Sequence, residues 1–150
     1  MRSNERKKTL GEVFTPSELV EEILNQLPEE IWQDPFKTFL DNSCGSGNFL
    51  VAVLERKLKQ GHDPLAALET IHGVDIMLDN VKECRRRLMA IAAAAGADLT
   101  TFKNKRILVR NIVKADGLRY HYRFDNTPPY DQEEPQPLET VGEDLFDFGA

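Results

Sequence analysis

The 150-residue sequence has very few of the residues that staple small extracellular proteins or hold structural metals. Cysteine occurs only at Cys44 and Cys84, with no CxxC pair, and the three histidines form no cluster at zinc-binding spacing. Disulfide frameworks need an even set of patterned cysteines, and zinc sites need grouped Cys and His side chains, so neither scaffold is indicated. We therefore expect no metal and a reducing, intracellular setting.

The sequence also lacks a long apolar run. No stretch approaches the roughly 20 apolar residues that a membrane-spanning helix needs. The polar opening MRSNERKK has no hydrophobic region of the kind that a signal peptide carries. These absences predict a cytoplasmic protein with no membrane segment, and the basic residues 1–9 are expected to be a disordered N-terminus.

Positive charge is scarce, because the formal net charge is −6. Residues 131–150 hold seven acidic residues and no Lys or Arg, so the first 130 residues carry a net +1. Proteins that bind DNA usually present clustered Lys and Arg, but a nearly neutral folded part leaves contact with DNA open. The acidic, Pro-containing residues 126–150 are interpreted as a tail, which leaves residues 10–125 as one domain.

Hydrophobic periodicity within that domain predicts alternating helices and strands. A capping box at Thr15 to Glu18, with Pro16 at the first helical position, opens a helix that ends before Pro28. The following elements are a strand at 36–40, a helix at 48–59, a short helix at 64–69, a strand at 71–75, a helix at 78–95 and a strand at 107–116. The buried face of the helix at 78–95 is expected to consist of Val81, Cys84, Leu88, Ile91 and Ala95. This order is typical of a doubly wound, mostly parallel α/β sheet, here incomplete and Rossmann-like with an N-terminal helix.

Three acidic residues, Asp41, Asp75 and Asp116, close the three predicted strands. In open α/β sheets, ligands bind outside the carboxyl ends of the strands. We therefore expect the three carboxylates to border one ligand site.

A glycine-containing loop, Asp41-x-x-Cys44-Gly45-x-Gly47, follows the first of these strands. Glycines expose backbone N–H groups at the start of the next helix, which suits an anion such as a carboxylate. The third glycine of a dinucleotide-binding loop is replaced by Leu50, which weakens that alternative. An acid just before the glycines repels a pyrophosphate but attracts an amine, so a ligand with both charges of an amino acid fits best.

The second and third strands add features that suit a nucleoside. Asp75 is placed to accept hydrogen bonds from ribose hydroxyls, and Ile76 beside it to cover one face of an adenine ring. Asp116 is placed to accept the exocyclic amine of that adenine. An amino acid, a ribose and an adenine together describe S-adenosylmethionine.

These segments resemble the adenine-N6 DNA methyltransferases of the class that includes type I restriction modification subunits. GEVFTP at residues 11–16 is similar to the N-terminal motif, whose Thr-Pro turn packs on the methionine moiety. DNSCGSGNFL at 41–50 is similar to the glycine motif, with Asn42 where proline is usual, while GVDI at 73–76 and NIVKAD at 111–116 are similar to the ribose and adenine motifs. The resemblance covers residues 10–118 and implies S-adenosylmethionine as cofactor, held by Phe14, Thr15, Pro16, Asp41, Cys44, Gly45, Gly47, Phe49, Asp75, Ile76 and Asp116.

The family performs its chemistry with an Asn/Asp/Ser-Pro-Pro-aromatic loop that holds the flipped target adenine. The only match here is Thr127-Pro128-Pro129-Tyr130, in which Thr127 keeps a hydroxyl acceptor and Tyr130 the stacking ring. The segment before it alternates aromatic and polar residues and follows Asp116 closely. Two interpretations stay open: a catalytic loop that uses Thr127, Pro128 and Tyr130, or a polyproline-like turn in a polar tail.

Three functions remain in consideration. The first is a minimal or split adenine-N6 DNA methyltransferase that reaches DNA through a partner or second subunit. The second is a catalytically silent cofactor-binding module that binds or regulates a full methyltransferase through the edge of its incomplete sheet. The third is a methyltransferase for another amine, such as a protein glutamine or an RNA base.

Individual residues also have simpler structural interpretations. Cys44 is expected to be a small loop residue and not a nucleophile, and Phe49 a core residue. The run Arg85-Arg86-Arg87 is interpreted as a solvated helix face.

Overall fold

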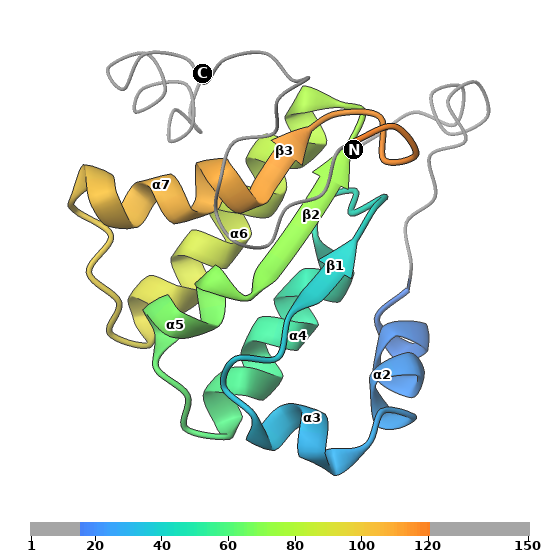
Figure 1. Cartoon of the computed structure of the whole chain (residues 1–150), viewed down its shortest axis with the longest axis vertical. Coiled ribbons are helices and arrows are strands. Elements are labelled where there is room, and N and C mark those ends of the chain that lie inside the picture. Colours follow the sequence, from blue (N-terminus) through green and yellow to red (C-terminus); the bar gives the residue numbers. More distant parts are fainter. Residues whose placement is uncertain (1–15, 121–150) are drawn as a thin grey trace.

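The computed structural model describes residues 16–120. Its helices are α2 (Ser17–Asn25), α3 (Glu29–Gln33), α4 (Asn48–Lys59), α5 (Pro64–Glu69), α6 (Leu78–Ala94) and α7 (Phe102–Asn111), and its strands are β1 (Phe39–Asp41), β2 (Ile71–Asp75) and β3 (Ile112–Lys114) (Figure 1).

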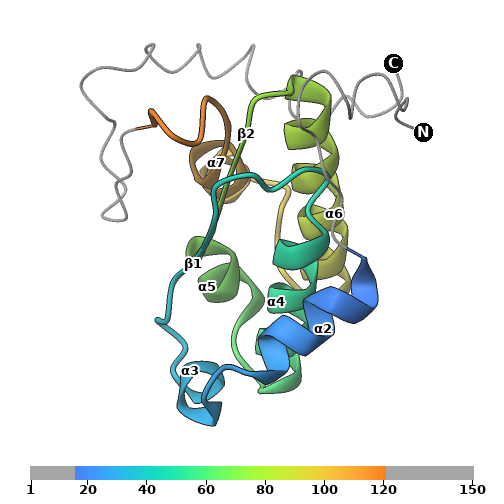
Figure 2. The same ribbon diagram turned by 90° about the vertical axis from the view of Figure 1, so that its right-hand side faces the viewer.

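The three strands form a parallel sheet in the order β1-β2-β3. Figure 2 shows α2, α4 and α6 on one side of this sheet, and α5 and α7 contact each other and β2. Both strand connections run through helices, as parallel pairing requires. The predicted Rossmann-like α/β fold is therefore confirmed for the described part of the chain.

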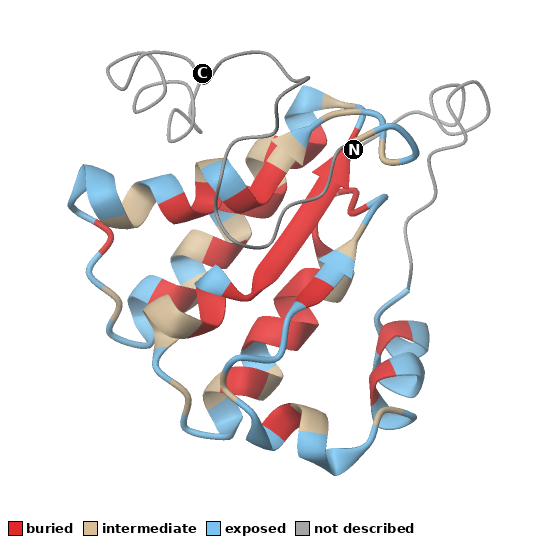
Figure 3. Cartoon of the chain, viewed as in Figure 1, coloured by how far each residue is buried: buried red, intermediate tan, exposed pale blue. Residues whose placement is uncertain are grey.

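The core lies between the sheet and the pair α4 and α6. Every residue of β2 is buried, so the central strand is red along its whole length in Figure 3. On α6, Val81, Cys84 and Leu88 are buried as the sequence predicts, but Ala92 completes the stripe, while the predicted Ala95 is exposed. The helix ends at Ala94, one residue earlier than predicted. Its buried stripe keeps the 3.6-residue period of a helix as far as Ala92.

One element was predicted wrongly. Residues 107–111 belong to α7 and not to a strand, and β3 is limited to Ile112–Lys114. Thr101 caps α7 by accepting a hydrogen bond from the Asn104 backbone N–H at 3.3 Å. The helix then buries Ile107, Leu108 and Asn111 on one face, so tertiary packing outweighs the strand preference of the β-branched residues.

The start of α2 also differs from the prediction. Pro16 is the N-cap and not the first helical residue. The predicted capping box depends on Thr15, which lies outside the described residues. The first strand is shorter than predicted as well, because it begins at Phe39 instead of residue 36.

Among residues 16–120, no helix has the length and apolarity needed to cross a membrane.

Candidate functional site

The carboxyl ends of the strands bring three loops together, at the upper end of the sheet in Figure 1. The backbone N–H of Cys44 donates to the carbonyl of Val74 at 2.9 Å, which ties the loop after β1 to β2. The N–H of Ala115 donates to the carbonyl of Asp75 at 3.0 Å, which ties the turn after β3 to the same strand. β2 is therefore the support on which both neighbouring loops rest.

The loop after β1 takes a conformation that requires its glycines. Gly45 and Gly47 have φ values of 55° and 97°, in the left-handed region. Gly47 is the N-cap of α4, and no side chain caps the helix there. The first N–H groups of a helix lack intrahelical partners, so the start of α4 suits an anionic group.

Gly47 and Gly117 also allow close packing. A Cβ atom at Gly47 would lie 2.7 Å from Cys84 Sγ on α6. A Cβ atom at Gly117 would lie 2.1 Å from the carbonyl oxygen of Asn42. The turn after β3 thus rests directly on the glycine loop, and this contact was not predicted.

Replacing Gly47 with alanine is expected to destabilise the fold more than replacing Gly61. Both glycines have positive φ, at 97° and 87°, but a Cβ atom at Gly61 meets nothing within 4 Å. Backbone strain alone should lower the free energy of unfolding by about 1 kcal/mol in Gly61→Ala. Overpacking against Cys84 should add about 1–3 kcal/mol in Gly47→Ala. Urea denaturation measures both, and equal losses would contradict the packing explanation.

Asp75 lies at the centre of the site and is 7% exposed. Its Oδ2 accepts the Gly45 backbone N–H at 3.0 Å, and its Oδ1 accepts the Met77 backbone N–H at 2.9 Å and Asn80 Nδ2 at 3.1 Å. A carboxylate offers about four lone-pair positions, and donors within residues 16–120 take three of them, which leaves about one on Oδ2. The carboxylate both fastens the glycine loop and, with respect to these donors, keeps one acceptor position.

Asp41 closes β1 beside this group. Its Oδ1 accepts the Ser43 backbone N–H at 3.0 Å. Burial raises the pKa of Asp41 above its usual value, and repulsion from the Asp75 carboxylate adds to the rise. Two neighbouring carboxylates at one edge of the sheet make a region that favours a cationic or hydrogen-bond-donating ligand.

The third predicted acid lies beyond its strand. Asp116 follows Lys114, the last residue of β3, by two positions, and it is partly exposed. Its Oδ1 accepts the Leu118 backbone N–H at 3.0 Å, and its Oδ2 lies 3.7 Å from Arg119 Nε. Ile76, directly after β2, is 56% exposed and offers an apolar surface at the same edge.

Cys44 in the glycine loop and Phe49 in the first turn of α4 both lie against the core. Cys44 is buried, and Phe49 packs against the core cluster. A hydrogen bond with Cys84 and burial raise the pKa of the Cys44 thiol. The thiol therefore stays protonated, as a packing residue does, and any ligand contact at Cys44 would come from its backbone.

The interpretation of Arg85-Arg86-Arg87 as a solvated face is wrong for two of the three residues. Arg85 is buried, and its Nε donates to the Ile112 carbonyl at 2.8 Å. Arg87 Nη1 donates to the Ser46 carbonyl at 3.0 Å and to Asn48 Oδ1 at 2.8 Å. Only Arg86 lies on the surface, where it pairs with Glu83. Three consecutive side chains on a helix point in three different directions, so these adjacent arginines lie in three different environments.

Sequence reasoning also missed Asn80, which orients Asp75, and the role of Arg87. A signal for both was present. Cys84 was predicted to face inward, and Asn80 and Arg87 lie four residues before and three residues after it, on the same face of a helix.

Several predicted site residues lie outside the described part of the chain, namely Phe14, Thr15, Thr127, Pro128 and Tyr130, together with the predicted terminal segments 1–9 and 126–150.

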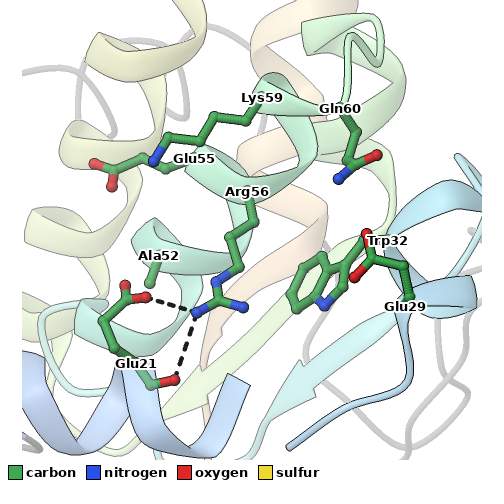
Figure 4. A pocket seen from close by; sticks show the side chains of 8 residues that line it. All are labelled: Glu21, Glu29, Trp32, Ala52, Glu55, Arg56, Lys59 and Gln60. Carbon is green, nitrogen blue, oxygen red and sulfur yellow. Dashed lines mark hydrogen bonds and ion pairs between the residues drawn. The ribbon is translucent and has the colours of Figure 1, made fainter. Parts of the chain in front are cut away.

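A cleft of about 260 Å³ opens elsewhere, between α2, α3 and α4 (Figure 4). There Arg56 Nη2 donates to Glu21 Oε2 at 2.6 Å, and the guanidinium lies over the Trp32 ring. The lining residues Arg56, Lys59 and Gln60 belong to the C-terminal end of α4, opposite the end that carries Gly47. The cleft is therefore separate from the site at the strand ends. No metal-binding group of His, Cys, Asp or Glu side chains occurs within residues 16–120.

A parallel sheet with a left-handed glycine turn and a buried acid at the end of its central strand defines a Rossmann-like domain with a candidate ligand site at the strand ends. The model of one family, N-6 DNA methylase, matches residues 1–125. The chain belongs to the N-6 DNA methylase family. No curated protein and no solved structure matches it.

Proposed function

We propose that the chain binds S-adenosylmethionine at the carboxyl ends of β1, β2 and β3, and that it serves the transfer of a methyl group to the exocyclic amine of adenine in DNA. The observation that carries this proposal is the buried Asp75 carboxylate, which ties Gly45 to β2 and has an acceptor position that no donor of the described residues occupies. Family membership supports a function in DNA methylation, and the arrangement of the site supports S-adenosylmethionine as the cofactor.

The amino-acid part of the cofactor fits the glycine loop. A carboxylate suits the N–H groups at the start of α4, where Gly47 provides the turn. An ammonium group suits Asp41, whose carboxylate lies close enough to Asp75 for the two to repel each other. The methionine end would therefore lie across the carboxyl end of β1.

The nucleoside part fits the ends of β2 and β3. Asp75 Oδ2 would accept a hydrogen bond from one ribose hydroxyl. The sequence alone suggests bonds to both hydroxyls, but Met77 and Asn80 already donate to Oδ1. Ile76 would cover the adenine ring, and Asp116 would accept its exocyclic amine. When bound, the cofactor supplies an electrophilic methyl group on sulfur.

The proposal is tested by isothermal titration calorimetry of the full chain with S-adenosylhomocysteine, with NAD as the comparison ligand. We expect saturable binding of S-adenosylhomocysteine and none of NAD, because Asp41 and Asp75 repel a pyrophosphate beside the glycine loop. No heat and no thermal shift up to millimolar S-adenosylhomocysteine would overturn the cofactor assignment. Tighter binding of NAD would support a dinucleotide site instead.

A catalytically silent module that acts with a partner chain is the second candidate. Within the described residues, β1 pairs on one side only, with β2, and Leu40 on this edge strand is 40% exposed. An edge strand with free backbone groups invites pairing with another chain. A partner at this edge would also provide a route to DNA for a domain that carries little net positive charge.

A further inference from the structure

We propose that one face of α6 holds the candidate cofactor site in its binding conformation, and that Arg87 on this face is the positioning residue for the amino-acid half of the ligand. This inference rests on the proposed function. The face consists of Asn80, Cys84 and Arg87, whose spacings of four and three residues place them along one side of the helix.

Arg87 holds the two residues that flank Gly47. Its Nη1 has two N–H groups, and this atom donates to the Ser46 carbonyl at 3.0 Å and to Asn48 Oδ1 at 2.8 Å. The guanidinium is planar and always charged, so these bonds are strong and fix direction as well as distance. They join α6 to the turn at the start of α4, across 41 and 39 positions of sequence.

The other two residues of this face act on the neighbouring parts of the site. Cys84 lies so close to Gly47 that a Cβ atom there would be 2.7 Å from its Sγ. Asn80 Nδ2 donates to Asp75 Oδ1 at 3.1 Å. Asn80 therefore orients the acid proposed for the ribose, while Cys84 and Arg87 shape the loop proposed for the amino acid.

The adjacent arginines show that this role belongs to one position. Arg85 is buried and bonds to the Ile112 carbonyl at the start of β3, away from the glycine loop. Arg86 is on the surface and pairs with Glu83 on its own helix. Arg86→Ala thus removes the same side chain from the same helix without touching the loop, and it is the matched control for Arg87→Ala.

The expected consequence concerns the freedom of residues 46–48. Without the guanidinium, this turn samples more conformations, and binding must then restrict them at an entropic cost. Only the part of a ligand that contacts the turn is sensitive to this change. We therefore expect a loss selective for ligands that carry an amino-acid group.

The experiment compares S-adenosylhomocysteine with 5′-methylthioadenosine, which shares the nucleoside and lacks the amino acid. Calorimetry on the full chain should show about tenfold weaker binding of S-adenosylhomocysteine by Arg87→Ala and less than a twofold change for 5′-methylthioadenosine. Arg86→Ala should change neither affinity, whereas Asn80→Ala should weaken both ligands alike. Arg87→Lys keeps the positive charge but has fewer donors in fixed directions, so it should recover part of the lost affinity for S-adenosylhomocysteine.

A second readout needs no ligand. Amide hydrogen exchange at residues 46–48 should be about tenfold faster in Arg87→Ala, with the rest of α4 unchanged. Equal weakening of both ligands by Arg87→Ala, or unchanged exchange in the turn, would overturn the positioning role while leaving cofactor binding intact. If the wild-type chain binds neither ligand, the proposed function itself fails, and the role of Arg87 in binding fails with it.

Discussion

Replacing Asp75 with alanine is expected to weaken the binding of S-adenosylhomocysteine by about 10- to 150-fold. A hydrogen bond to a charged group contributes about 1.5–3 kcal/mol, and the variant loses the one that Asp75 Oδ2 is proposed to make with the ribose. The glycine loop loses its anchor as well, because the Gly45 N–H donates to that same oxygen. Calorimetric titration of both proteins measures the effect.

The same variant should also be less stable. Asp75 is buried, and its removal leaves the N–H groups of Gly45 and Met77 and the amide of Asn80 without their acceptor. Buried donors that lose their partner destabilise by about 1–3 kcal/mol each, and entering water offsets part of this, so we expect a total of about 2–4 kcal/mol. Urea denaturation gives this value independently of any ligand.

Asp63→Ala is the control that separates the two effects. Asp63 Oδ2 caps α5 by accepting the Ala66 N–H at 3.0 Å, far from the strand ends in sequence and fold. Losing this cap should lower stability by about 1 kcal/mol and leave affinity unchanged. If Asp75→Ala binds as tightly as the wild type, the ribose assignment is wrong, however unstable the variant is.

Two of the elements that border the site were predicted with their observed bounds. The helix at 48–59 and the strand ending at Asp75 were predicted with the bounds that the structure shows, because glycines and proline punctuate the apolar periodicity there. The helix that contains Ile107 was missed for the opposite reason. Its β-branched residues are followed directly by those of β3, with no glycine or proline between them to mark the boundary. Only the buried contacts of Ile107, Leu108 and Asn111 favour a helix over a strand there.

The long-range bonds of the site were beyond the reach of sequence reasoning. Asp75 was identified as a strand-end acid, but nothing local to it reveals that Gly45, 30 residues earlier, uses one of its oxygens. In the same way, the run Arg85-Arg86-Arg87 has one composition and three environments. Which acceptor positions an acid retains for a ligand depends on the assembled fold, so the number of hydrogen bonds that Asp75 can offer to a ribose follows only from its contacts in the structure.

The purified 150-residue chain is expected to transfer no methyl group to duplex DNA above background. Transfer needs an acceptor loop aligned with the methyl group, and rate enhancement falls steeply when such a loop is held loosely. Ten residues separate Asp116 from Thr127, fewer than the dozen or more that a crossover to a further parallel strand needs. Some of them are already used, since the N–H groups of Arg119 and Tyr120 fold back to the Asp116 carbonyl at 3.0 and 2.9 Å.

Because of this short spacing from Asp116, we expect the tetrapeptide Thr127-Pro128-Pro129-Tyr130 not to act as an acceptor loop at the proposed methionine end of the cofactor. Incorporation of labelled methyl groups into adenine-containing duplex DNA measures turnover, with Thr127→Ala and Tyr130→Ala as controls. Turnover by the wild type that both substitutions abolish would show that the tetrapeptide works as a catalytic loop. Turnover that requires a second chain with an Asn-Pro-Pro-Tyr loop would identify a split enzyme, in which this chain binds the cofactor and its partner provides the acceptor loop.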